Sequence, residues 1–90
     1  MTAECEILVR GVVQGVGFRY FVLQRARRLN LFGFVCNLEM GDVKIIAEGE
    51  RSLLEELIRY VKVGPPNAHV DYVDVLWNTW TGKFYKFEIR

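Results

Sequence analysis

Apolar and polar residues alternate over several short stretches of the chain, which is the pattern typical of half-buried β-strands. Cys5, Ile7 and Val9 form the first such apolar face, and similar alternation recurs three more times before the chain closes on another short run. The predicted strands cover residues 5–13, 31–37, 42–48 and 69–77, and a short final strand contains Tyr85, Phe87 and Ile89.

Two other stretches space their apolar residues three or four apart, as on one face of a helix. The first begins at Phe18 and has basic residues near its end, where cations suit the helix dipole. The second begins near Ser52, because Ser52 and Glu55 have the spacing of a capping box, and it ends at Gly64 before two prolines. The apolar faces consist of Phe18, Phe21, Val22, Ala26 and Leu29 in the first helix and of Leu54, Leu57, Ile58 and Val61 in the second.

The predicted order of elements is therefore βαββαβ with a trailing strand. This order is typical of a ferredoxin-like α+β sandwich, in which two helices cover one face of an antiparallel sheet and a short extra strand ends the chain. At 90 residues and 10.5 kDa, residues 1–90 have room for a single domain with one core. The fold leaves the function open.

Charge and composition exclude several classes of protein. The chain has 12 basic and 11 acidic residues and so lacks the basic surplus of most nucleic-acid binders. Its longest apolar runs have the length of strands, so we expect no membrane span. The first residues include acids where a signal peptide needs bases, and we therefore expect a cytoplasmic protein.

Two cysteines and one histidine do not form a recognisable disulfide framework or zinc site. Cys5, Cys36 and His69 occur without any C-x-x-C or H-x-x-x-H spacing. We expect two semi-buried apolar thiols, a solvent-exposed histidine, and no bound metal or cofactor.

The most unusual segment is residues 14–19, Gln-Gly-Val-Gly-Phe-Arg, between the first strand and the first helix. A helix N-terminus leaves several N–H groups without partners and carries partial positive charge. The two glycines allow successive N–H groups to turn toward one point. Arg19 is unfavourable in a first helical turn unless a bound anion reverses the local charge. Together these features indicate a phosphate cradle.

Simpler interpretations of this segment remain open at this point. Glycines between a strand and a helix often make only a tight turn, and a single arginine on a helix is common. The named phosphate motifs are absent: the dinucleotide fingerprint would need glycine where Tyr20 stands, and no glycine-lysine-serine/threonine triplet follows.

Asn37 is the polar residue predicted to lie beside this cradle. In the predicted topology the second strand ends at the same end of the sheet as the first, which brings Asn37 near residues 14–19. Its amide offers a donor and an acceptor that can hold a water or a substrate carbonyl. The alternative is that Asn37 only begins a hairpin turn, a position that asparagine favours.

The loop lacks a histidine, a carboxylate pair and a nucleophilic cysteine. If it hydrolyses a phosphoryl compound, the leaving group must depart without a proton donor. A carboxylate can do so because its conjugate acid has a pKa of roughly 4, whereas an alkoxide cannot. The site therefore suits a mixed anhydride of carboxylic and phosphoric acid better than an alkyl phosphate ester.

Residues 9–21, Val-Arg-Gly-Val-Val-Gln-Gly-Val-Gly-Phe-Arg-Tyr-Phe, resemble the first signature of the acylphosphatase family. Residues 33–43, followed by Gly49, resemble the second, and Gly64-Pro65-Pro66 and the closing residues 87–90 resemble the family's C-terminal half. The resemblance implies a metal-free hydrolase that splits small-molecule acyl phosphates into carboxylate and phosphate. Nothing in the sequence demands more than a monomer, and from charge and hydropathy we expect neither nucleic acid nor membrane as a partner.

The same resemblance implies roles for individual residues. The phosphoryl group would be bound by Gln14, Gly15, Val16, Gly17, Phe18 and Arg19. Asn37 would orient the attacking water, so Arg19 and Asn37 are the expected catalytic residues. Cys36 departs from the family, which more often has a basic or other polar residue there.

Three rival functions remain. An RNA-binding module is suggested by Phe32-Gly33-Phe34-Val35, although its flanking residues and its place on the second strand do not fit. A non-catalytic anion sensor would need the cradle but no residue that positions water. A part of a carbamoyl-phosphate-handling machine would be expected to belong to a longer chain.

Overall fold

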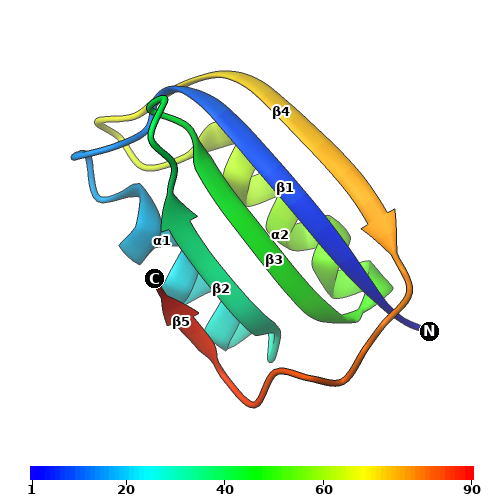
Figure 1. Ribbon diagram of the computed structural model, residues 1–90. Helices are drawn as coiled ribbons and strands as arrows, with labels where there is room; N and C mark the ends of the chain where they lie inside the picture. Colours follow the sequence, from blue (N-terminus) through cyan, green and yellow to red (C-terminus); the bar gives the residue numbers. More distant parts are fainter.

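The computed structural model describes residues 1–90 as a five-stranded sheet with two helices on one face (Figure 1). The strands lie in the order β4-β1-β3-β2-β5, which confirms the predicted ferredoxin-like fold with its extra final strand. The elements are β1 (Thr2–Val12), α1 (Phe18–Arg28), β2 (Phe32–Asn37), β3 (Val43–Glu50), α2 (Arg51–Val63), β4 (His69–Asn78) and β5 (Phe87–Ile89).

Four of the strands pair antiparallel, as predicted, but β5 pairs parallel to β2, so the complete sheet is mixed. This direction follows from the route of the chain. A strap (residues 79–86) carries it from β4 at one edge, around the end of the sheet, to β5 at the other edge (Figure 1). The last residues thereby arrive beside the end of β2.

The faces predicted from periodicity form the core. Val43, Ile45 and Ala47 of β3 are fully buried against the helices, as are the corresponding residues of β1. The predicted apolar stripe of α2 is also buried. Burying a Val, Leu or Ile side chain contributes about 1.5–3 kcal/mol, so this layer stabilises the scaffold that carries the loops. Neither helix is long and apolar enough to cross a membrane.

The beginning of α2 differs from the prediction. The helix starts at Arg51 after Glu50, and no side chain caps it, so the capping box expected from Ser52 and Glu55 is wrong. The N–H of Arg51 instead donates to the carbonyl oxygen of Met1 at 2.8 Å. The start of β1, remote in sequence, therefore satisfies the first donor of this helix. Its end is as predicted: the helix stops at Gly64, which has φ 73°.

The final strand is shorter than predicted. Tyr85 lies in the strap and is 94% exposed, so only Phe87–Ile89 pair with β2. The strap is attached to the sheet by Glu48, whose side chain is almost fully buried. The carboxylate of Glu48 accepts hydrogen bonds from the backbone N–H groups of Thr81 and Gly82, both at 3.0 Å, and from the Thr81 hydroxyl at 2.6 Å. These contacts fix the path by which β5 reaches the site.

Candidate active site

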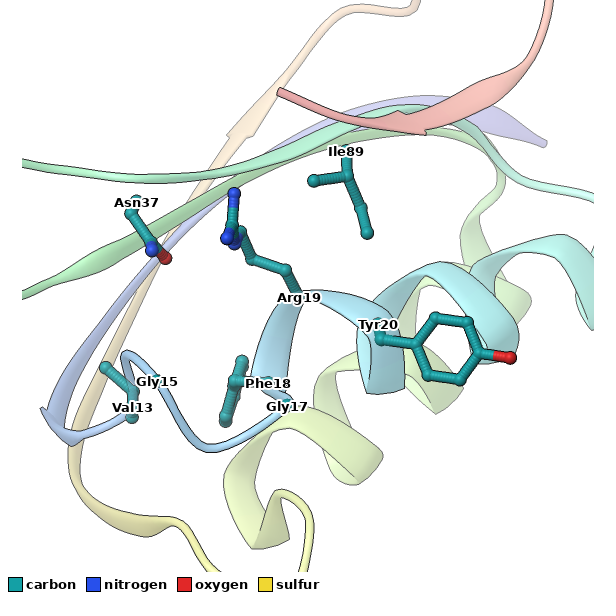
Figure 2. Close-up of a pocket in the computed structure, with 8 residues that line it drawn as sticks. All are labelled: Val13, Gly15, Gly17, Phe18, Arg19, Tyr20, Asn37 and Ile89. Carbon is teal, nitrogen blue, oxygen red and sulfur yellow. The ribbon is translucent and has the colours of Figure 1, made fainter.

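A cavity of about 170 Å³ opens where β1, α1 and β2 meet (Figure 2). Its walls come from the β1–α1 connection, the first turn of α1, the last residue of β2 and β5. Neither a histidine nor a carboxylate side chain lines it. The lining residues are Val13, Gly15, Gly17, Phe18, Arg19, Tyr20, Asn37 and Ile89.

The β1–α1 connection leaves a row of donors unpaired. The first hydrogen bond of α1 runs from the N–H of Phe21 to the carbonyl of Gly17 at 3.0 Å, and no side chain caps the helix. The backbone N–H groups of residues 15–20 donate to no acceptor in the chain. Unpaired N–H groups at a helix start, together with the helix dipole, favour an anion at this position.

Gly15 and Gly17 produce this arrangement through their backbone conformation. Both have positive φ angles, 72° and 79°. A Cβ atom added at either residue would meet nothing within 4 Å, so space is not the constraint. A left-handed conformation costs a residue with a side chain roughly 1–2 kcal/mol, which glycine avoids. The two glycines therefore allow the loop to curl before the helix begins.

Arg19 brings a positive charge to the cavity and has no Asp or Glu side chain as a partner. Its guanidinium lies in the space between Asn37 and Ile89 in Figure 2. Its single hydrogen bond runs from Nη1 to the backbone oxygen of Arg90, at 3.4 Å. The first turn of α1 contains no acidic residue. No acidic side chain therefore neutralises the guanidinium, which suits a phosphoryl group.

Asn37 ends β2 and turns its side-chain amide toward the cavity (Figure 2). Its Oδ1 atom is buried and has no hydrogen-bond partner. The chain supplies no donor to this oxygen, so it is free to accept a hydrogen bond from a ligand or a water. A water molecule or a protonated substrate atom would supply that donor.

The structure brings most of the predicted site residues together. Gly15, Gly17, Phe18, Arg19 and Asn37 line one cavity, although the Phe18 ring is buried and only its backbone is available there. The other two predicted cradle residues, Gln14 and Val16, are not among the lining residues. Val16 packs against the core. Gln14 directs its side chain elsewhere: Nε2 donates to the carbonyls of Leu38, at 2.7 Å, and Asp42, at 2.9 Å.

Tyr20 and Ile89 line the cavity but were not predicted as site residues. Ile89 comes from β5, which reaches the site only because it pairs in parallel beside β2. Tyr20 is exposed on α1, and its hydroxyl accepts a hydrogen bond from Nε2 of Gln24 at 3.2 Å. The sequence offered one signal that Tyr20 belongs to the site, namely its position directly after Arg19.

The remaining candidate chemistry lies outside the cavity. Cys5 is fully buried, and burial, followed by the charge of Glu4, raises the pKa of its thiol to about 12, so it is not a nucleophile. Cys36 is half-buried and free, and His69 is exposed beside Asp71. Cys36 and His69 are therefore placed as predicted, whereas Cys5 is more deeply buried than the predicted semi-buried state. No group of three or more His, Cys, Asp or Glu side chains is arranged to hold a metal ion.

Comparison with known proteins gives a consistent result. The acylphosphatase family profile matches residues 5–89. The chain is 44% identical to an acylphosphatase of Dehalococcoides mccartyi, an alignment that covers 92% of each protein. It is also 44% identical to an acylphosphatase of Anaeromyxobacter, over 98% of this chain and 95% of that one. The crystal structure of acylphosphatase from Bacillus subtilis superposes with a TM-score of 0.95 at 38% identity and covers 100% of this chain and 99% of that one.

Proposed function

Because this chain belongs to the acylphosphatase family and hydrolyses acyl phosphates, we propose that a water held by Asn37 attacks a phosphoryl group bound by Arg19 and residues 14–19. Family, fold and enzyme class are the premise. The roles of individual residues are the proposal, and they rest on the geometry of the cavity.

The phosphoryl group is bound mainly through its charge. Its oxygens accept hydrogen bonds from the unpaired N–H groups that follow Gln14, and the Arg19 guanidinium adds two more donors. These donors are in place before substrate arrives, so little reorganisation is needed when charge develops in the transition state. Binding and transition-state stabilisation thus come from the same loop.

The chemical step is an in-line displacement at phosphorus. Oδ1 of Asn37 accepts a hydrogen bond from the water and orients its oxygen toward phosphorus. A bond forms between the water oxygen and phosphorus while the bond from phosphorus to the acyl oxygen breaks. The products are a carboxylate and inorganic phosphate, and the water's proton passes to solvent. No acidic side chain lines the cavity, which suits a carboxylate leaving group that needs no proton.

The observation that carries this proposal is the unpaired Oδ1 of Asn37 in a cavity otherwise lined by anion-binding donors. An anion-binding domain would use only the Nδ2 donor of this amide, because the Oδ1 acceptor repels phosphate oxygens. A water-positioning role explains why the acceptor stands beside the cradle.

The test is hydrolysis of benzoyl phosphate by wild-type protein and an Asn37→Ala variant, with EDTA present throughout. We expect Asn37→Ala to lower kcat about 100-fold or more. Competitive inhibition by inorganic phosphate should stay within about twofold of wild type, since the loop and Arg19 remain. Asn67→Ala, on the exposed connection before β4, is the matched control. Unchanged turnover of Asn37→Ala would refute the proposed role.

Metal independence, a monomeric state and a cytoplasmic location remain predictions from the sequence. The EDTA in the assay tests the first of these. Gel filtration of the purified protein tests the second.

A further inference from the structure

We propose that the side chain of Gln14 positions Asn37 relative to the anion cradle and does not itself bind the phosphoryl group. This inference rests on the proposed role of Asn37. It assigns Gln14 a task different from that of its neighbours in the loop, residues 15–19.

The side chain of Gln14 is already fully engaged as a donor. Its single NH₂ group donates to the carbonyls of Leu38 and Asp42, at 2.7 and 2.9 Å, and both contacts are partly buried. A primary amide has only two N–H bonds, so none remains for a ligand. The other polar atom, Oε1, is an acceptor and would repel phosphate oxygens.

The two carbonyls bonded by Gln14 close the base of the β2–β3 hairpin. Leu38 directly follows Asn37, and its own N–H donates to the carbonyl of Asp42 at 2.8 Å. The hairpin is thus closed by its own backbone, and Gln14 adds a direct link to the first residue of the cradle. That link spans 24 residues to Leu38 and 28 to Asp42.

β1 and this hairpin are also joined by the backbone pairing of β1 with β3, and by a second side-chain link that is weaker than that of Gln14. Nε of Arg10 lies 3.3 Å from Oδ2 of Asp42, and the Arg10 side chain is well exposed. An exposed ion pair contributes only about 0–1 kcal/mol. Gln14 is therefore the main side-chain link between the cradle and the turn that follows Asn37, and it acts in addition to the backbone pairing of β1 with β3 and of β3 with β2.

Such a connection matters because in-line attack is sensitive to position. A displacement of about 1 Å between reacting groups can lower a rate about 100-fold. Without Gln14, we expect the hairpin and the cradle to move relative to each other. The water held by Asn37 would then approach phosphorus from a poorer angle, while the cradle itself would still bind phosphate.

The experiment compares Gln14→Met with wild type in the benzoyl phosphate assay. Methionine keeps the unbranched shape of glutamine but removes both donors. We expect kcat to fall about 10- to 100-fold, with phosphate inhibition within about twofold of wild type. Gln24→Met removes a comparable donor from the middle of α1 and should retain kcat within about twofold. Normal kcat in Gln14→Met, or clearly weaker phosphate inhibition, would overturn the inference.

A double-mutant cycle separates this inference from the proposed function. In an Asn37→Ala background the Gln14→Met change should alter kcat less than about twofold, because the residue it positions is gone. An equal loss in both backgrounds would overturn the inference alone. Normal turnover of Asn37→Ala by itself would overturn the proposed function and this inference with it.

A second variant covers the case in which Gln14→Met does not fold. Gln14→Glu also keeps the side-chain length, but at neutral pH it turns carboxylate oxygens toward the same two carbonyls. We expect a larger loss of kcat than for Gln14→Met, again with nearly normal phosphate inhibition. Wild-type kcat in Gln14→Glu would overturn the inference.

Discussion

The two ends of the sheet differ in whether the chain provides an acceptor for their backbone N–H groups. At the end where β1 meets α1, the N–H groups of residues 15–20 donate to no acceptor within the chain. At the other end, where the strap passes, the N–H groups of Thr81 and Gly82 both donate to the carboxylate of Glu48. At the strap, the anion is the Glu48 carboxylate of the chain itself. At the β1–α1 connection, the anion has to come from a ligand.

The arginines in the first turns of the two helices also differ in their surroundings. Arg51, in the first turn of α2, lies 4.0 Å over the Trp77 ring and 3.8 Å from a carboxylate oxygen of Glu55. Arg19, in the first turn of α1, contacts only a backbone oxygen. An arginine near a helix N-terminus is therefore not by itself a sign of a binding site, since what surrounds the guanidinium decides its role.

Glu48 illustrates how this fold binds an oxyanion. Backbone N–H groups and one hydroxyl surround its two oxygens at 2.6–3.0 Å. The cradle offers the same type of donor to a ligand, with a guanidinium added. The difference between the ends is whether the anion is covalently part of the chain, and three predictions test that difference.

The largest expected effect is on activity. Arg19→Ala should lower kcat/KM about 100- to 1,000-fold and weaken competitive inhibition by inorganic phosphate, because a preorganised charged donor is lost. Arg51→Ala, the matched change at the other helix, should leave both quantities within about twofold. Steady-state kinetics with benzoyl phosphate measure the two variants. Similar activity losses in both would show that the two arginines do not differ in this way.

The next effect is on stability. Glu48→Ala should lower the free energy of unfolding by about 2 kcal/mol, because it removes a buried carboxylate that accepts three hydrogen bonds from the strap. Glu50→Ala removes only an exposed ion pair with the N-terminal amine and should lower it by less than about 1 kcal/mol. Urea unfolding of both variants measures the difference. Equal losses would mean that Glu48 does not anchor the strap.

The smallest effect concerns pH. Glu4 lies opposite Glu48 across β1 and β3. Burial, followed by the hydrogen bond and charge of Glu48, raises the pKa of Glu4 above its ordinary 4.5, although Lys83 and Asn78 oppose the shift. Burial alone would raise the pKa of Glu48, but hydrogen bonds from Glu4, Thr81 and Gly82 outweigh it and lower the value. As pH falls, a proton is therefore taken up by Glu4 before Glu48.

These shifts have opposite consequences for stability. The contribution of Glu4 is complete below pH 4.5 and is lost as pH rises through its raised pKa. The contribution of Glu48 is present above 4.5 and is lost as pH falls through its lowered pKa. Glu4→Gln keeps a donor toward Glu48 at every pH, so its urea midpoint should change less than that of wild type as pH rises above 4.5. Glu39→Gln, at an exposed position, should behave like wild type, and the same change with rising pH in Glu4→Gln would contradict the raised pKa of Glu4.

Features that depend on local sequence were predictable. The alternation of β1 and β3 and the helical spacing in α2 reflect which faces are buried, and those faces are buried in the structure. The cradle was also accessible, because glycines and an arginine at a helix start are a local pattern. Asn37 needed one more step, the topology that brings the end of β2 to the same place.

Features that depend on distant partners were not predictable. The N–H group of Arg51, the first residue of α2, donates to the carbonyl of Met1, and no pattern around Ser52 predicts this bond. Ile89 joins the site only through the parallel pairing of β5, and the strap that carries β5 there is anchored by Glu48. The partners of Gln14 lie 24 and 28 residues away, so the loop sequence suggested a ligand contact where the side chain makes a structural link.

The order of elements, the buried faces and the presence of an anion-binding turn were determined by the sequence itself, since periodicity and backbone freedom act over a few neighbouring residues. Tertiary structure decided which donors are left unpaired. The cradle and the strap differ in this respect, and so do Arg19 and Arg51. The reason is that an acceptor from any part of the chain can satisfy a donor once folding brings the two together.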